Sequence, residues 1–281
     1  MAGGDCSDLS HKHERLLRSL ADMRSAVLAF SGGVDSTLVL AAAADARSRF
    51  GGDMLRFLAL TTASPTNTAE EVEQARALAE RIGIEHVVIA TNELETPGYA
   101  DNPAHRCYLC KQTLYPLCLS MAHRHGLAFV ADGVNRDDLS DYRPGLRAAV
   151  ELGVRHPLVE AELTKAEVRE LSRRYGLPTA DAPASPCLSS RFPYGTRITE
   201  QRLAQVAAAE AALKRLGFVE LRVRYYGERA RVEVAAGELG RLSDASLRDA
   251  AVAAVAAAGF SEVELAAEPL RSGSLNAAIG R

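Results

Sequence analysis

The chain has 281 residues, of which 47% are hydrophobic and 25% charged, which is enough apolar material for one large or two modest globular domains. A formal net charge of −3 argues against a surface that attracts nucleic acid as a whole. No stretch offers the long uncharged apolar run of a secretion signal or a membrane span, so we expect a cytoplasmic protein without a membrane partner.

The first part of the chain alternates apolar runs with helical patterns. The runs at 26–30, 54–62, 85–91, 127–133 and 154–160 predict five strands, and the patterns at 11–22, 36–50, 66–81, 107–126 and 165–175 predict helices. Such alternation is typical of an α/β fold with a doubly wound parallel sheet, which binds ligands at the carboxyl ends of its strands.

Residues 177–199 are rich in proline, serine and threonine and predict a linker or an active-site loop. We place a domain boundary within it, between residues 1–185 and 186–281. Beyond it, helices are predicted at 200–216 and 243–258 and strands at 219–226, 229–234 and 262–266. The second domain is therefore expected to be a small α+β unit.

The stretch AVLAFSGGVDST, residues 26–37, predicts a phosphate-binding loop between a buried strand and a helix. Gly32 and Gly33 let the backbone turn sharply and approach a ligand. Ser31 and Ser36 add hydroxyl donors, and the free N–H groups of the helix that follows favour an anion. Asp35 is a candidate ligand for a metal ion that bridges phosphates. No lysine follows the glycines, so this is not a Walker A loop; the bland alternative is an ordinary tight turn.

An odd number of cysteines in a chain without an export signal argues against a disulfide framework. Cys107 and Cys110 form a C-x-x-C pair, and Cys187 lies in a distant loop. Three interpretations stay open for this set: a structural zinc site completed by a residue such as His105, a dithiol redox pair, or an iron–sulfur or sulfur-handling site. Cys118 fits a small buried side chain, and Cys6 is assigned no role.

Six motifs occur in order along the chain. They are SGGVDS (31–36), NPAHRCYLCK (102–111), ADGVNRDDLSDYRPGL (131–146), SPCLSSR (185–191), LRVRYYGERARVEV (221–234) and LRSGSLN (270–276). With all of them present, the chain resembles the LarE family of ATP-dependent sulfur transferases, which belongs to the PP-loop ATP pyrophosphatases. The resemblance covers nearly the whole chain, whereas SGGVDS alone would indicate only the superfamily.

The resemblance implies a PP-loop domain and a small C-terminal domain for substrate binding and oligomerisation, with assembly as a homo-oligomer, often a hexamer. It implies that ATP adenylates a carboxylate of pyridinium-3,5-biscarboxylic acid mononucleotide, with release of pyrophosphate, and that the carboxylate becomes a thiocarboxylate. The product leads to a nickel-pincer nucleotide cofactor. In one branch the cysteine matching Cys187 gives up its own sulfur; in the other, cysteines matching Cys107, Cys110 and Cys187 hold a [4Fe-4S] cluster. All three are present here, which favours the cluster branch.

The expected site residues follow from the motifs and the resemblance together. For ATP and Mg²⁺ they are Ser31, Gly32, Gly33, Asp35, Ser36, Thr62 and Gly133, with Asp35 as the magnesium ligand. For the substrate they are Arg191, Glu210, Arg222, Arg224 and Glu233, since a guanidinium matches phosphate and carboxylate in bidentate fashion. Arg222 and Arg224 alternate on a predicted strand, so a solvated face or a subunit contact is the alternative for them.

Three other functions compete with the sulfur transferase. A PP-loop tRNA thiolase also combines a C-x-x-C with a distal cysteine, but this chain lacks an evident basic run for RNA, so no nucleic-acid partner is expected. An enzyme that uses ammonia in place of sulfur would leave the three cysteines dispensable. A nucleotide-binding sensor would bind ATP without turnover.

Overall fold

The computed structural model describes residues 4–140 and 143–271. Asp141 and Tyr142 of the third motif, and the sixth motif from Ser272 onward, lie outside this range. None of the helices described combines the length and the hydrophobicity that crossing a membrane requires. The chain forms two compact units, the first made of Met1–Ser64, Ala69–Thr91 and Cys107–Ser185 and the second of Pro65–Thr68, Asn92–Arg106 and Pro186–Arg281.

The first unit is built on a parallel sheet of four strands in the order β3-β2-β1-β4. The strands are β1 (Ser25–Ala29), β2 (Arg56–Ala63), β3 (Glu85–Ala90) and β4 (Phe129–Ala131). Each lies within or largely within a predicted run. Because the sheet is parallel, all four carboxyl ends meet at one edge.

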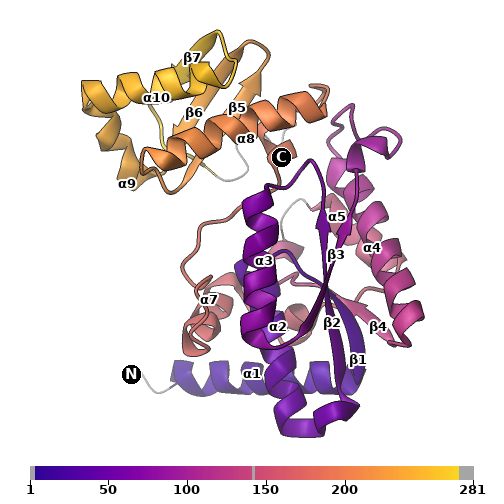
Figure 1. Cartoon of the computed structure of the whole chain (residues 1–281). Helices are drawn as coiled ribbons and strands as arrows, with labels where there is room; N and C mark the ends of the chain where they lie inside the picture. The colour runs from indigo at the N-terminus through magenta and orange to yellow at the C-terminus, as the bar shows by residue number, and fades with distance from the viewer. Residues whose placement is uncertain (1–3, 141–142, 272–281) are drawn as a thin grey trace. The chain divides into compact units, whose positions relative to one another are not determined.

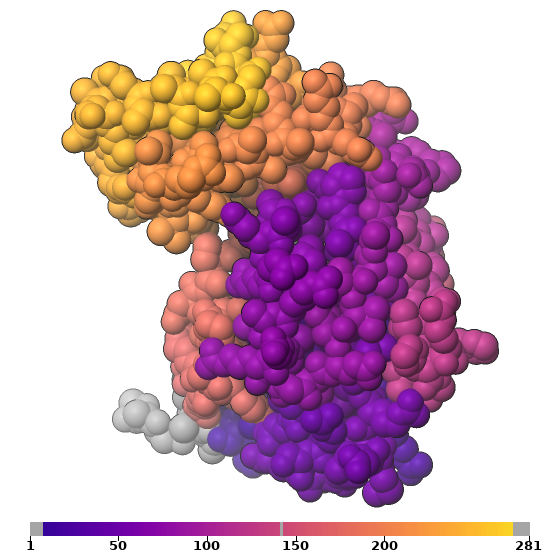
Figure 2. Space-filling model, viewed as in Figure 1, coloured from indigo at the N-terminus to yellow at the C-terminus, as the bar shows by residue number. Residues whose placement is uncertain are grey.

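Helices cover both faces of this sheet (Figure 1). On one side lie α1 (Gly4–Met23), α2 (Val34–Ala46), α3 (Ala69–Ile82) and α7 (Lys165–Arg174); on the other lie α4 (Arg106–His125) and α5 (Pro144–Glu151). Successive residues of a strand point to opposite faces of the sheet and pack into two separate hydrophobic cores. Leu28 packs on the α2 side and Val27 on the α4 side. The predicted doubly wound α/β fold is confirmed. Figure 2 shows α3 on the outer face of this unit, which places its charged residues at the surface.

The strand predicted at 154–160 is wrong. The segment makes a single bridge, between Ala131 and Arg155, and then forms the short helix α6 (Pro157–Glu160). Pro157 lacks the N–H that a strand ladder needs but fits the first position of a helix, where that group has no partner in any case.

The second unit contains a three-stranded sheet in the order β5-β6-β7, with β5 and β6 antiparallel and β6 and β7 parallel. Its elements are α8 (Glu200–Arg215), β5 (Leu221–Tyr226), β6 (Arg229–Val234), α9 (Ala236–Leu239), α10 (Ala245–Ala257) and β7 (Glu262–Leu265). Helices α8 and α10 pack on each other, and α8 also packs on β5. The predicted α+β character is observed.

Short helical turns connect the longer elements. They are η1 (Arg47–Gly51), η2 (Gly52–Met54), η3 (Glu93–Glu95), η4 (Asp137–Leu139), η5 (Leu188–Arg191) and η6 (Gly240–Ser243).

Two segments from the first half of the chain belong to the second unit. The Asn102 amide donates hydrogen bonds to Phe192 O at 3.2 Å and Pro193 O at 2.7 Å, and the Tyr99 hydroxyl lies 2.9 Å from Ser189 Oγ. Asn102 has a φ of 56°, in the left-handed region that asparagine tolerates better than most residues. The predicted boundary at 185/186 assigns both segments to the first domain. As functional domains, 1–185 and 186–281 stay a prediction.

Candidate functional site

Residues 31–36 form a tight loop that follows β1 and includes the first three residues of α2, and the Ser36 hydroxyl closes it. Ser36 Oγ accepts from Ser31 N at 3.3 Å, donates to Gly33 O at 3.1 Å and lies 3.2 Å from Ser31 Oγ. Gly32 has a φ of 74°, which favours glycine. The loop therefore leads directly into the N-terminal turn of α2, where N–H groups and the helix dipole favour an anion.

Gly133 follows β4 and touches this turn. A Cβ built on Gly133 would lie 2.7 Å from Ser36 N and 3.0 Å from Asp35 C, both backbone atoms. Only glycine allows so close an approach without a backbone shift. The structure thus places Gly133 beside the loop to which the sequence assigns ATP.

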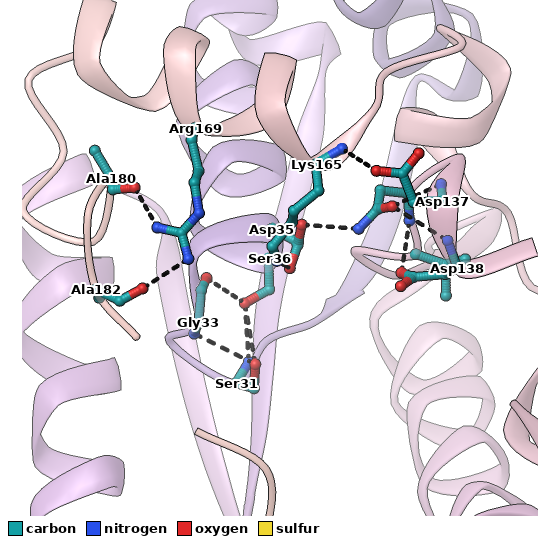
Figure 3. A network of polar contacts seen from close by, with 12 residues as sticks. Ser31, Gly33, Asp35, Ser36, Asp137, Asp138, Lys165, Arg169, Ala180 and Ala182 are labelled. Atoms are coloured by element: carbon teal, nitrogen blue, oxygen red, sulfur yellow. Dashed lines mark hydrogen bonds and ion pairs between the residues drawn. The ribbon is translucent and has the colours of Figure 1, made fainter. Parts of the chain in front are cut away.

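Asp35 belongs to a ring of polar contacts drawn from three segments of the first unit (Figure 3). One carboxylate oxygen accepts from Asn135 Nδ2 at 3.1 Å, and the other pairs with Lys165 Nζ. Asn135 Oδ1 accepts from Asp137 N at 2.9 Å, and Asp137 Oδ2 accepts from Lys165 N at 2.9 Å. The ring fixes the start of α7 against the loop at 135–137 and the first turn of α2.

Asp132 lies next to this ring and is buried, with 4% of its surface exposed. Its carboxylate accepts from the Tyr115 hydroxyl at 2.6 Å and forms an ion pair with His156 Nδ1 at 2.7 Å. Burial alone would raise the pKa of Asp132, but His156, Lys111 and Tyr115 outweigh it and the pKa is lowered. Burial would lower the pKa of His156, yet the hydrogen bond that it donates to Asp132 and the negative charge of that carboxylate raise it. Both pKa shifts favour the charged forms of this pair, a buried carboxylate and a half-buried imidazole.

The second unit holds a separate cluster of arginines and glutamates. Arg191 and Glu210 form a bidentate pair with distances of 2.8 and 2.9 Å, and Arg224 Nε donates to Glu233 Oε2 at 2.9 Å. Arg224 also donates to Ser190 O at 2.9 Å. Both arginines are thus fixed by carboxylates, which gives the cluster a rigid geometry.

Arg222 belongs to the same cluster but has a different environment. It is 5% exposed, and within residues 4–140 and 143–271 no hydrogen bond or ion pair reaches its guanidinium. Burial and then the positive charges of Arg224 and Arg191 lower its pKa to about 10. A buried cation with this little compensation favours an anionic ligand.

Two comparisons with known proteins bear on these sites. A family model described as asparagine synthase matches residues 16–123, which include the loop. The pyridinium-3,5-bisthiocarboxylic acid mononucleotide synthase of Lactiplantibacillus plantarum is 36% identical over 95% of this chain and 95% of its own length. The chain belongs to the LarE family. The family comprises ATP-dependent sulfur transferases of the PP-loop type.

Two further relatives match this LarE-family chain. An uncharacterized protein of Synechocystis sp. is 44% identical over 95% of this chain and 98% of its own length. The tRNA-specific 2-thiouridylase MnmA of Thermus thermophilus is 29% identical over 58% of this chain and 53% of the relative. Of the two relatives with a named function, the LarE-family synthase therefore matches a larger share of this chain than MnmA does.

The cysteines of this LarE-family chain lie in both units. Cys107 and Cys110 stand one turn apart in the first turns of α4, the first exposed and the second half-buried; Cys187, half-buried, directly precedes η5 in the second unit. Cys118 is buried, which raises its pKa to about 12 and fits a packing role. Among the residues described, no three His, Cys, Asp or Glu side chains form a group that could hold a metal ion.

The positions of the predicted residues can be stated unit by unit. In the first unit, the loop residues, Asp35 and Gly133 lie together, while Thr62 is half-buried at the carboxyl end of β2. Its neighbour Thr61 is engaged, donating to Phe30 O at 2.6 Å and lying 2.8 Å from His86 Nε2. In the second unit, the predicted arginines and glutamates form the cluster described above.

Sequence reasoning missed Lys165, His156 and Lys111. Lys165 starts a predicted helix, where a cation usually faces solvent, and its partner Asp35 lies 130 residues away. His156 stands in the run that was taken for a strand. Lys111 ends the second motif, with its Nζ 5.1 Å from the centroid of the Tyr115 ring. The signal available for Lys111 was its place beside the C-x-x-C pair.

Proposed function

We propose that this chain uses ATP and Mg²⁺ to adenylate a carboxylate of pyridinium-3,5-biscarboxylic acid mononucleotide and then converts that group to a thiocarboxylate. The activity would supply a precursor of a nickel-pincer nucleotide cofactor. The family membership supports the reaction class, and the activity for which the Lactiplantibacillus plantarum relative is named, at 36% identity, supports the substrate.

The first unit supplies the ATP-binding features of the proposal. The loop at 31–36 and the start of α2 would bind the pyrophosphate that leaves. The Asp35 carboxylate, half-buried beside the loop, offers the hard oxygen ligand that Mg²⁺ prefers, and the ion would neutralise phosphate charge there. Thr62 and Gly133 complete the proposed nucleotide site.

The observation that carries the substrate class is Arg222. Within the described residues no carboxylate forms an ion pair with its guanidinium. Glu210 and Glu233 act on Arg222 only through their charge, because they are paired with Arg191 and Arg224. A ligand with a phosphate and carboxylates supplies the missing negative charge. A sulfur transferase with a neutral substrate would gain nothing from this arrangement.

The chemistry proceeds by making a better leaving group. A carboxylate oxygen attacks the α-phosphorus of ATP and expels pyrophosphate, which gives an acyl adenylate. A sulfur nucleophile then attacks the acyl carbon and expels AMP. The loop donors stabilise the charge that develops on the departing phosphates.

Two sulfur sources fit the chain. Cys107, exposed, and Cys110, half-buried, stand one turn apart on α4 and would suit two thiolate ligands of a [4Fe-4S] cluster. Cys187 is the third ligand by the family resemblance alone. Such a cluster would provide a sulfide for transfer. Alternatively, Cys187 would give up its own sulfur.

Turnover with the proposed substrate tests the reaction. Purified protein with ATP, Mg²⁺ and pyridinium-3,5-biscarboxylic acid mononucleotide should release pyrophosphate, and mass spectrometry should detect the thiocarboxylate. Arg222→Met should abolish substrate-dependent release, whereas Arg229→Met, on the adjacent strand with an exposed side chain, should retain it. Release that depends on tRNA instead of the mononucleotide would favour a tRNA thiolase, and no release with either would favour a sensor.

Anaerobic purification with iron and sulfide analysis separates the sulfur sources. A cluster should give broad visible absorption that Cys110→Ala removes. A colourless active protein whose mass falls by about 34 Da during turnover would identify Cys187 as the donor. Iron-free protein that transfers sulfur without a change in its own mass would contradict both proposed sulfur sources.

The remaining expectations concern the protein's assembly and location. We propose a cytoplasmic location, because either sulfur source needs reduced thiols. We also propose a homo-oligomer, a hexamer by analogy with the family. Light scattering of the purified protein measures the number of subunits.

A further inference from the structure

The ion pair between Lys165 and Asp35 is notable because Asp35 is the proposed magnesium ligand. Lys165 begins α7, and its Nζ meets the Asp35 carboxylate in the first turn of α2, directly after the loop at 31–36 (Figure 3). The Lys165 side chain is 37% exposed and that of Asp35 is 23% exposed. The pair is therefore open to an incoming ligand.

The backbone at Lys165 is fixed while its side chain is long and mobile. Lys165 N donates to Asp137 Oδ2 at 2.9 Å, and the Thr164 capping box secures the same helix end. The four-carbon side chain can consequently exchange one oxygen partner for another without movement of α7. The neighbouring Arg169 differs, since its two terminal nitrogens donate to Ala180 O at 2.6 Å and Ala182 O at 2.9 Å (Figure 3).

Charge balance requires an exchange when ATP and Mg²⁺ arrive. A divalent ion binds a carboxylate more strongly than an ammonium does, so it would displace Lys165 from Asp35. The released ammonium would then lie beside the loop where phosphate oxygens enter. An ammonium is a common phosphate-binding group in proteins.

We propose that Lys165 is a phosphate-binding residue of the ATP site, which neutralises Asp35 in the nucleotide-free protein and moves to a β- or γ-phosphate oxygen when ATP and Mg²⁺ bind. The inference rests on the proposed use of ATP and adds a residue to it. Asp35 is thereby compensated at both stages, first by Lys165 and then by Mg²⁺, and the released lysine favours the triphosphate over the monophosphate.

Calorimetric binding of ATP and of AMP, each with Mg²⁺, tests this role in the full chain. Lys165→Met should weaken ATP binding by about 10- to 100-fold, as expected for loss of a charged hydrogen bond, and leave AMP binding within about twofold. Without nucleotide, the same variant should bind Mg²⁺ more tightly than the wild type, because its competitor for Asp35 is gone. A purely structural lysine would not move the two affinities in opposite directions.

Two further variants make the test specific. Lys165→Arg keeps the charge and should recover part of the ATP affinity. Lys12→Met removes a lysine that pairs with Glu167 in the same first turn of α7 but not with Asp35, and it should change neither nucleotide affinity. Equal losses of ATP and AMP binding in Lys165→Met, or unchanged ATP binding, would overturn the inference about Lys165 but not the proposed function. A wild-type protein that binds neither nucleotide would overturn the proposed function as well.

Discussion

Gly133 packs directly against the backbone of the loop at 31–36 and limits the shape that this loop can take. It carries no catalytic group, but any side chain there would collide with the backbone of Ser36 and Asp35. Because backbone atoms cannot swing aside as a side chain can, the loop itself would have to shift. The residue therefore sets the geometry of donors to which it makes no hydrogen bond.

Replacing Gly133 by alanine should both destabilise the protein and weaken ATP binding. Overpacking of this kind lowers the free energy of unfolding by about 1–3 kcal/mol, and displacement of Ser36 N removes a donor for phosphate. Urea unfolding and calorimetric ATP binding measure the two effects. Gly237→Ala is the control, since a Cβ there meets nothing within 4 Å; equal behaviour of the two variants would contradict the argument.

The Asp132–His156 pair should make stability depend on pH. The pKa of His156 is raised above its ordinary value of 6.5, so its contribution is complete below that value and is lost as pH rises through the raised pKa. The pKa of Asp132 is lowered from 3.8, so its contribution is complete above that value and is lost as pH falls through the lowered pKa. The full effect of the pair is therefore confined to a window from about pH 4 to 6.5.

His156→Asn should thus cost most stability in mildly acidic solution. Removing one partner of a buried pair lowers the free energy of unfolding by about 3 kcal/mol near pH 5.5, and the difference from the wild type should shrink towards pH 9. Urea denaturation at both pH values measures it. A penalty that grows with pH would show that His156 is neutral in the folded protein.

At the scale of elements, α7 holds the chain just before the second unit begins. Arg169 binds Ala180 O and Ala182 O, and Arg173 Nη2 donates to Asp181 Oδ1 at 2.8 Å. Farther along, Ser185 Oγ donates to Glu71 at 2.7 Å. The segment 177–199, predicted as a linker or an active-site loop, is thus attached to the first unit along its first half.

Arg169→Met should release this segment. Loss of two charged hydrogen bonds of about 1.5–3 kcal/mol each should speed limited proteolysis within 177–187 by at least about tenfold. Cleavage sites are identified by mass spectrometry. Arg174→Met, which alters a cation at the end of the same helix, should leave the rate unchanged, and a matching increase there would point to general loosening of α7.

Local patterns in the sequence predicted most of these elements, and their failures have physical causes. Four of five predicted strands of the first unit exist because buried parallel strands are apolar throughout. The fifth was misread because VRHPLVE is apolar enough for a strand while its proline favours a helix start. The SGGVDS loop was found from residue types alone, since its conformation is set by neighbours in sequence.

Contacts between distant residues left no such local signal. The alternation of Arg222 and Arg224 is equally typical of a solvated strand, and only packing decides that both are buried. The pairing of Lys165 with Asp35 joins helices 130 residues apart. The assignment of 92–106 to the second unit likewise depends on partners such as Ser189 and Pro193.

At the scale of the whole molecule, the second unit cannot be obtained by cutting the chain at residue 186. Its interior includes Tyr99 and Asn102, which are almost fully buried, and Leu188 N donates to Thr66 O at 2.9 Å. A fragment of 186–281 would expose the groups that these residues satisfy. Buried hydrogen-bonding groups without partners are costly to a small unit.

We therefore expect the 186–281 fragment to lack a cooperative unfolding transition, although it contains all three strands of its sheet. Circular dichroism with urea measures this, with the full chain as control. In the full chain, Asn102→Ala should lower the free energy of unfolding of the second unit by about 2–3 kcal/mol through loss of its amide hydrogen bonds. A fragment that unfolds cooperatively would show that 65–68 and 92–106 are dispensable.

The same interleaving has a consequence for synthesis on the ribosome. Tyr99 and Asn102 leave the exit tunnel 90 residues before Ser189 and Phe192, their partners in the finished protein. Until those partners are synthesised, Tyr99 and Asn102 cannot be buried as they are in the finished protein. Nascent chains that end before residue 186 should therefore expose the segment 92–106 and bind a chaperone, whereas chains extended past β7 should not.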